Sequence, residues 1–310
     1  MFALISGLLL LLAGGESLIT GATKLAARLG MSPLLIGLTV VAFGTSMPEL
    51  FVSINATIGG HPDIMFGNVV GSNIANIGLI LALSAIISPL AVCYHRLKVE
   101  FILLIAASLV LVAATVYGSF PRGLGLVFSS TLFAYTYVAY RLENKVKNSK
   151  SVHFDPENSQ QPSYIVIALL CVIGLVLMWF GSDYFIAGAV DLARFFGLSE
   201  LVIGLTLAAV GTSLPELASC LSAIRKNEAD MLVGNIVGSN LFNLLLVLGM
   251  TALIKPFDLP PGTLVRDLPV MTGLSMVLVP LALFRKRISR VDGILLLVVY
   301  CGYIYVVGSM

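Results

Sequence analysis

The side chains best suited to do chemistry are two glutamates, Glu49 and Glu216, each inside a long apolar stretch of the sequence. A charged side chain at the centre of a bilayer is energetically expensive, so an acid at that depth is a functional candidate by default. The two glutamates share one local sequence, Gly-Thr-Ser-x-Pro-Glu. Two carboxylates in matched settings predict a site that binds cations.

Neutral oxygen donors accompany each glutamate at fixed spacings. Thr45 and Ser46 precede Glu49 in helical register, which would put their hydroxyls and its carboxylate on one helix face. The equivalent hydroxyls, with Ser and Asn from the next apolar segment of each half, complete the candidate set: Thr212, Ser213, Ser72, Asn76, Ser239 and Asn243. Hard cations such as Ca²⁺ take about six to eight oxygen ligands, whereas transition metals favour His or Cys. Neither residue type accompanies these motifs, so an all-oxygen site is expected.

Membrane-spanning helices must hold these residues, because the chain is 58% hydrophobic and only 11% charged. A span needs about 20 mainly apolar residues. Ten candidate spans follow from this length, near 2–23, 33–58, 65–89, 100–118, 122–140, 164–190, 201–224, 231–254, 266–284 and 290–309. The expected fold class is an all-α membrane protein with ten transmembrane helices.

The two halves of the sequence repeat one another. GLTVVAFGTSMPEL at 37–50 matches GLTLAAVGTSLPEL at 204–217, and GNVVGSNIAN at 67–76 matches GNIVGSNLFN at 234–243, both with an offset of 167 residues. A constant offset indicates two copies of one larger unit. Because each unit has five spans, an odd number, the second copy is inverted in the membrane. Inverted repeats place a transport site near the midplane, on helices interrupted by Gly or Pro.

Loop charge predicts the orientation of the chain. With the N-terminus outside, 14 of the 18 Lys and Arg residues fall in cytoplasmic loops, as the positive-inside rule requires. Both termini then lie on the outer side of the cell (inner or plasma) membrane, and the polar segment 142–163 is a cytoplasmic linker. The predicted domains are a five-helix repeat at 1–141, this linker, and a second five-helix repeat at 164–310.

Other polar residues in these spans are interpreted as structural. Small and amide side chains in membrane helices often only pack or hydrogen-bond between helices, and we assign that role to Gly67, Asn68, Gly71, Asn73, Gly234, Asn235, Gly238 and Asn240. Glu16 and Asp183 lie off-centre in their spans, where a carboxylate can stay hydrated or pair with a basic side chain. They are also assigned structural roles.

The doubled motif resembles the alpha repeats of the cation/calcium antiporter superfamily, especially its prokaryotic sodium/calcium exchangers, over nearly the whole chain. The resemblance implies ten helices in two inverted five-helix halves, ion sites clustered at the centre, and first and sixth helices that slide past the bundle. It assigns Ca²⁺ to Glu49, Glu216, Thr45 and Thr212. It assigns Na⁺ to Ser46, Ser213, Ser72 and Ser239 with the carbonyls of Ala42 and Ala209, and it puts Asn76 and Asn243 in the middle of the cluster.

The expected function is secondary active antiport of Ca²⁺ against Na⁺ by alternating access. Two carboxylates balance one Ca²⁺ or two monovalent cations, so an empty site would hold uncompensated charge. Exchange of Ca²⁺ or another cation for H⁺ stays open, because carboxylates also bind protons. Several members of the resembling family carry Asp where this chain has Asn243, which disfavours K⁺ co-transport. We expect no enzymatic activity, no resident cofactor and no nucleic-acid partner, and a chain that works as a monomer in the lipid bilayer.

Overall fold

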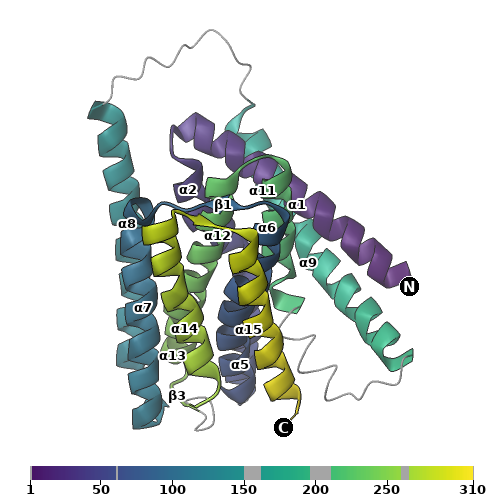
Figure 1. The fold of residues 1–310 in the computed structure, drawn as a ribbon, viewed down its shortest axis with the longest axis vertical. Helices are drawn as coiled ribbons and strands as arrows, with labels where there is room; N and C mark the ends of the chain where they lie inside the picture. Colours follow the sequence, from purple (N-terminus) through teal and green to yellow (C-terminus); the bar gives the residue numbers. More distant parts are fainter. Residues whose placement is uncertain (1, 61, 150–161, 196–210, 260–264, 310) are drawn as a thin grey trace.

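The computed structural model describes residues 2–60, 62–149, 162–195, 211–259 and 265–309, and these are mostly helical (Figure 1). In this part of the chain, seven helices are long and apolar enough to cross a membrane, or eight when the bent pair Pro33–Thr45 and Met47–Ile58 counts as one span. The protein is therefore an α-helical, multi-pass membrane protein, as the sequence predicts. Residues 201–210 of the expected span 201–224 lie outside the described residues, and its remainder falls mostly on helix α11.

The first half of the chain contains long helices and spans that are broken into shorter segments. Its helices are α1 (Phe2–Leu29), α2 (Pro33–Ile36), η1 (Gly37–Val41), α3 (Ala42–Thr45), α4 (Met47–Ile58), α5 (Pro62–Ala75), η2 (Asn76–Leu81), α6 (Ala82–Ile87), α7 (Tyr94–Tyr117) and α8 (Arg122–Ser149). The segments labelled η are π-helical turns. Because α8 continues to Ser149, the start of the segment expected as a linker is helical.

The second half contains the same kinds of element. Its helices are α9 (Tyr164–Phe195), α11 (Leu214–Arg225), α12 (Ala229–Leu241), η3 (Phe242–Val247), α13 (Leu248–Ile254), α14 (Asp267–Pro280), η5 (Leu281–Arg285) and α15 (Arg290–Gly308). The π-helical turns η2 and η3 both follow a Gly-Ser-Asn sequence, in α5 and α12 respectively. Such turns appear frequently at functional sites.

Two short antiparallel strand pairs join the halves. Strand β1 (Leu90–Ala91) pairs with β4 (Arg287–Ile288), and β2 (Ser119–Phe120) pairs with β3 (Phe257–Asp258). In each pair one strand comes from before residue 141 and the other from after residue 164. The two halves are therefore held together by backbone hydrogen bonds as well as by helix packing.

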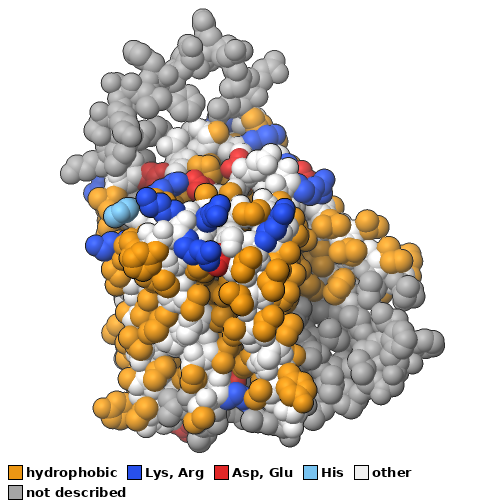
Figure 2. Space-filling model, in the orientation of Figure 1, with side chains coloured by type: hydrophobic (Ala, Val, Ile, Leu, Met, Phe, Trp, Pro, Cys, Tyr) orange, Lys and Arg blue, Asp and Glu red, His pale blue; other side chains and the backbone are white. Residues whose placement is uncertain are grey.

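The outer surface of the bundle suits a lipid environment. Large apolar side chains are exposed on several helices, among them Ile102 on α7, Phe133 on α8 and Val298 on α15. Figure 2 shows an apolar face with Lys and Arg gathered mainly at one end. A soluble protein would rarely expose so much contiguous apolar surface.

Helices α1 and α9 pack along one another and run obliquely beside the bundle (Figure 1). Glycines allow their backbones to meet: a Cβ at Gly14 would lie 2.7 Å from the carbonyl oxygen of Gly174. Small residues at such contacts give close van der Waals packing in lipid. Glu16 of α1 also forms an ion pair of 2.5 Å with Lys226, at the end of α11, which agrees with the structural role assigned to this acid.

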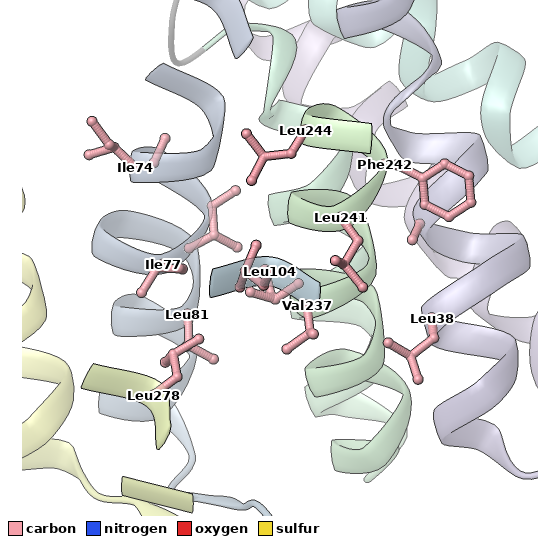
Figure 3. Close-up of a cluster of buried hydrophobic side chains, with 14 of the residues drawn as sticks. Leu38, Ile74, Ile77, Leu81, Leu104, Val237, Leu241, Phe242, Leu244 and Leu278 are labelled. Atoms are coloured by element: carbon pink, nitrogen blue, oxygen red, sulfur yellow. The ribbon is translucent and has the colours of Figure 1, made fainter. Parts of the chain in front are cut away.

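Helix α12 packs at the centre of the bundle against α2 and η1. A Cβ at Gly234 would lie 2.4 Å from the carbonyl oxygen of Leu34, and one at Gly37 would lie 2.4 Å from that of Met231. Buried side chains that include Leu38, Leu241 and Val237 surround this contact (Figure 3). The packing role assigned to Gly234 is thus explained by its geometry. The contact fixes α12 beside the segment that leads to Thr45.

We predict that Gly234→Ala destabilises the protein by about 1–3 kcal/mol, because the new methyl group overpacks a backbone-to-backbone contact. Gly273→Ala in α14 is the matched control, since no described atom lies within 4 Å of a Cβ placed there. Thermal unfolding of both variants in the same detergent checks this. An unfolding temperature for Gly234→Ala equal to that of the control would show that the contact tolerates a methyl group.

Candidate functional site

Both Gly-Thr-Ser-x-Pro-Glu motifs contain a break in the helix. Ser46 has φ −84° and ψ 4°, and Ser213 has φ −89° and ψ 5°, so both leave the α-helical region. Pro48 and Pro215 follow in the first turn of α4 and α11, where a missing N–H is harmless. The axis bends by 42° between Pro33–Thr45 and Met47–Ile58. Each motif therefore begins a new helix inside the membrane.

Glu49 and Glu216 lie in the first turn of these new helices and are both fully buried, with 0% exposure. The N-terminus of a helix carries partial positive charge, which favours an anion. Ser46, three residues before Glu49, donates to Glu216 Oε1, so the two motifs are in direct contact. The fold thus buries one acid from each half in the interior of the bundle.

These two carboxylates accept few hydrogen bonds from the described residues. Ser46 Oγ donates to Glu216 Oε1 at 3.3 Å. Among the described residues, Glu216 Oε2 and both oxygens of Glu49 have no hydrogen-bond partner, although the hydroxyls of Ser72 and Thr212 lie close enough to interact with the charge of Glu49. Buried charge without partners is unfavourable, so these oxygens are suited to receive cations.

The two threonines bond across the halves. Thr45 Oγ1 lies 3.3 Å from both Asn235 Oδ1 and Ser239 Oγ. Thr212 Oγ1 lies 3.2 Å from Asn68 Oδ1 and 3.3 Å from Ser72 Oγ. The two sets of contacts are equivalent under the 167-residue offset.

This arrangement corrects the expectation that Thr45 and Glu49 share one helix face. Because the helix breaks at Ser46, between the two residues, helical register does not carry from one to the other. Thr45 contacts Asn235 and Ser239 instead, as Thr212 contacts Asn68 and Ser72. Each threonine therefore faces the polar residues of the opposite half.

Two asparagines assigned to packing hold the new helices in place. Asn68 Nδ2 donates to the carbonyl oxygen of Glu49 at 3.1 Å and to Ser53 Oγ at 2.9 Å. Asn235 Nδ2 donates at 2.9 Å to the Oγ of Ser219, which itself donates to the carbonyl oxygen of Glu216 at 2.8 Å. These bonds connect both asparagines to the segments that carry the glutamates, in addition to their contacts with the threonines. Ser53 and Ser219 were missed, although they too recur 166 residues apart, one residue out of register with the repeat.

The remaining amides lie at the π-helical turns. Asn76 begins η2, and Asn243 lies within η3. Asn76 Nδ2 donates to Asn240 Oδ1 at 3.0 Å. Within the described chain, Asn76 Oδ1 and both amide atoms of Asn243 are buried without a partner. A π-helical turn interrupts the regular α-helical pattern of backbone hydrogen bonds. Buried amides that are left unpaired beside it are available to an ion or a water molecule.

The remaining candidate ligands are the hydroxyl of Ser213 and the backbone carbonyls of Ala42 and Ala209. Ser213 Oγ is buried and has no hydrogen-bond partner among the residues described. The carbonyl oxygen of Ala42 accepts from Ser46 N at 3.0 Å and from Thr45 Oγ1 at 3.4 Å, so it lies at the helix break and keeps a helical partner. Ala209 lies outside the described residues.

The donor set is chemically simple. No group of three or more His, Cys, Asp or Glu side chains occurs in the part of the chain that the structure describes. Two carboxylates with hydroxyl and amide oxygens suit a hard cation and not a transition metal. These residues come from both halves of a helical membrane bundle, which defines the class as a membrane protein that handles cations.

The chain belongs to the sodium/calcium exchanger protein family, whose model matches residues 1–141 and 166–308. The family consists of exchangers, which are transporters and not enzymes. The resemblance seen in the sequence is thereby confirmed, and cation antiport follows as the general function.

Individual relatives match over nearly the full chain. Putative antiporter CaxA of Alkalimonas amylolytica is 38% identical over 98% of this chain and 97% of its own length. Sodium/calcium exchanger MaX1 of Methanosarcina acetivorans is 32% identical over 98% of this chain and 97% of its own. A structure of the sodium-calcium exchanger NCX_Mj, soaked with 10 mM Na⁺ and zero Ca²⁺, superposes with a TM-score of 0.83 at 32% identity, covering 98% of this chain and 97% of that one.

We predict that Ca²⁺ raises the unfolding temperature of the purified protein and that Glu49→Gln and Glu216→Gln each abolish this increase. A ligand at 100 times its dissociation constant stabilises by about 2.7 kcal/mol, and losing one carboxylate removes half of the balancing charge. Thermal unfolding with Ca²⁺ or with chelator measures the effect. Asp183→Asn, an exposed acid on α9, is the control and should keep the increase. Equal stabilisation of all four proteins would contradict this site.

Proposed function

We propose that this protein exchanges Ca²⁺ for Na⁺ by alternating access, with Glu49 and Glu216 as the shared ligands at the centre. The observation that carries the proposal is the burial of both carboxylates in two motifs that contact one another, with three of their four oxygens unpaired among the described residues. A site of net charge −2 in low dielectric needs either one divalent ion or two monovalent ones.

Exchange, and not one-way leakage, follows from the same charge. With both carboxylates empty, the change between outward and inward states would have to carry uncompensated charge through the bilayer interior. With Ca²⁺ or Na⁺ bound, that charge is neutral or nearly so. The loaded protein is therefore expected to change state readily, and the empty one reluctantly.

The proposed ligands fall into two overlapping sets. For Ca²⁺ we propose the two glutamates with Thr45 and Thr212. For Na⁺ we propose the serine hydroxyls and two backbone carbonyls, namely Ser46, Ser213, Ser72, Ser239, Ala42 and Ala209, with Asn76 and Asn243 between the ions. The crosswise contacts support this scheme, because they join hydroxyl and amide oxygens of the two halves, and Ser46 of the first motif donates to Glu216 of the second.

The proposed architecture behind the site is two inverted five-helix repeats, 1–141 and 164–310, joined by a cytoplasmic linker at 142–163. Equivalent contacts at Thr45 and Thr212 support the two-fold relation. Both termini would lie on the outer, non-cytoplasmic side of the membrane, and α1 would slide together with α9. Inner membrane protein YrbG of Escherichia coli, 38% identical over 88% of this chain and 86% of its own, supports the inner membrane as the location. A monomer would suffice for transport.

We predict that proteoliposomes loaded with Na⁺ take up Ca²⁺ when external Na⁺ is removed, and that the rate falls to background without an outward Na⁺ gradient. Radioactive Ca²⁺ uptake at equal pH on both sides measures this. The competing hypothesis of Ca²⁺/H⁺ exchange is tested in the same vesicles. If a pH gradient drives uptake without Na⁺, and a Na⁺ gradient does not, the proton would replace Na⁺ as the coupling ion.

Neutralising either glutamate should abolish uptake in this assay while the protein stays folded. Glu49→Gln and Glu216→Gln keep the size of the side chain and remove its charge, so Ca²⁺ would be left with a single negative ligand. Asp183→Asn serves as the matched control and should transport at the wild-type rate. Wild-type uptake by either glutamine variant, with monodisperse protein, would contradict the assignment.

A further inference from the structure

A deep apolar groove lies on the outer surface between α14 and α15. Its volume is about 450 Å³. The lining residues are Pro269, Val270, Gly273, Leu274, Val277, Leu281, Asp292, Leu295, Leu296 and Val299. A second hollow of about 390 Å³ shares Val270 and Val299 with it and continues toward Val306. The two hollows together form one elongated groove along α14 and α15, on the surface that faces the bilayer.

Gly273 shows that the protein leaves this space unfilled. No described atom lies within 4 Å of a Cβ placed at Gly273, whereas Gly234 and Gly37 have backbone atoms at 2.4 Å. A glycine in the middle of a helix is destabilising relative to Ala. Because no described part of the chain lies near the Cβ position of Gly273, the space beside it is open to a group from outside the chain.

One end of the groove meets a basic cluster, which we define as Arg285, Lys286, Arg287 and Arg290. All four side chains are exposed. Arg285 pairs with Asp292, the acid that lines this end of the groove. Figure 2 shows Lys and Arg side chains gathered at one end of an apolar face, on the side of the molecule where Figure 1 shows α14 and α15 in front.

Asp292 is largely committed within the protein, which leaves the cluster with excess positive charge. Its Oδ2 accepts from Ser289 N at 2.8 Å and from Ser289 Oγ at 2.6 Å, and its Oδ1 accepts from Arg285. Arg290 Nε donates to the carbonyl oxygen of Ile86 at 3.1 Å. Lys286 and Arg287 are therefore well placed to attract an anion.

We propose that this groove binds an anionic phospholipid. The phosphate would lie against Lys286 and Arg287, and one acyl chain would occupy the groove beside Gly273. Basic residues at the end of transmembrane helices attract anionic headgroups, and the groove has the apolar lining that an acyl chain requires. The site is separate from the glutamates and does not depend on which ions the protein exchanges.

A second copy of the chain is the competing occupant, and charge disfavours it. Two copies in one membrane would pair about a two-fold axis along the membrane normal, which puts the same surface of each against the other. The basic clusters of both chains would then lie at the same depth near that axis. Their mutual repulsion would oppose the contact, whereas a phosphate would be attracted.

Native mass spectrometry of the full-length protein, exchanged into detergent with equal amounts of phosphatidylglycerol and phosphatidylcholine, tests the proposal. We expect wild-type protein to retain phosphatidylglycerol preferentially. Each basic residue near the headgroup is worth about fivefold, so Lys286→Gln with Arg287→Gln should lower that preference by roughly tenfold to thirtyfold. The matched control, Lys24→Gln with Arg225→Gln, removes two exposed charges from α1 and α11 and should keep it.

A second variant tests the groove itself. Gly273→Leu fills the space, so retained lipid of either headgroup should fall, whereas Val298→Leu on the exposed face of α15 should not change it. Unfolding temperatures in detergent without lipid confirm that both variants are folded. Equal retention of the two lipids by wild-type protein, or retention unchanged by Gly273→Leu, would overturn the proposal. A wild-type dimer that Gly273→Leu converts to monomer, with no change in lipid, would assign the groove to a second copy instead.

Discussion

The structure depends on one electrostatic constraint: two glutamates, Glu49 and Glu216, are buried inside a membrane protein, in motifs that contact one another. Like charges in a medium of low dielectric repel strongly, and each one also loses its hydration. Hydrogen bonds from the described residues satisfy only one of the four carboxylate oxygens. The fold therefore holds a pair of buried acids that a bound cation or a proton can neutralise.

The surrounding architecture keeps that pair in position. The helix breaks at Ser46 and Ser213 put each glutamate at the N-terminus of a new helix, where the helix dipole favours negative charge. Asn68 donates a hydrogen bond to the backbone carbonyl of Glu49, and close packing at Gly234 brings α12 against the segment that leads to the first motif. These contacts are numerous and short-range, which suits a rigid central scaffold. The α1 and α9 pair lies beside it, and glycines such as Gly14 and Gly174 mediate the contact of the two helices with one another.

The sequence alone predicts the membrane-spanning nature of the chain and its family, because the composition and the doubled motif leave strong signals in the residues themselves. The choice of Glu49 and Glu216 as ligands stays a prediction. The sequence does not predict the direction of the threonines. Helical register suggests that Thr45 faces Glu49, but the break at Ser46 turns it toward Asn235 and Ser239 of the other half. The φ and ψ angles of Ser46 set the direction of the Thr45 side chain relative to Glu49, and these angles depend on tertiary packing. Sequence spacing also could not predict the role of Asn68, since its acceptors, the carbonyl oxygen of Glu49 and the hydroxyl of Ser53, lie on another helix and are placed by tertiary packing.

The claim that both glutamates share one divalent ion is tested most directly by locating that ion. Crystals of the protein soaked in Sr²⁺, a heavier stand-in for Ca²⁺, would reveal it through anomalous scattering. We predict a dominant peak within about 2.3–2.6 Å of an oxygen from Glu49 and from Glu216, the range typical of Ca²⁺ ligands. A dominant peak that contacts one glutamate alone, or that lies away from both, would contradict the mechanism.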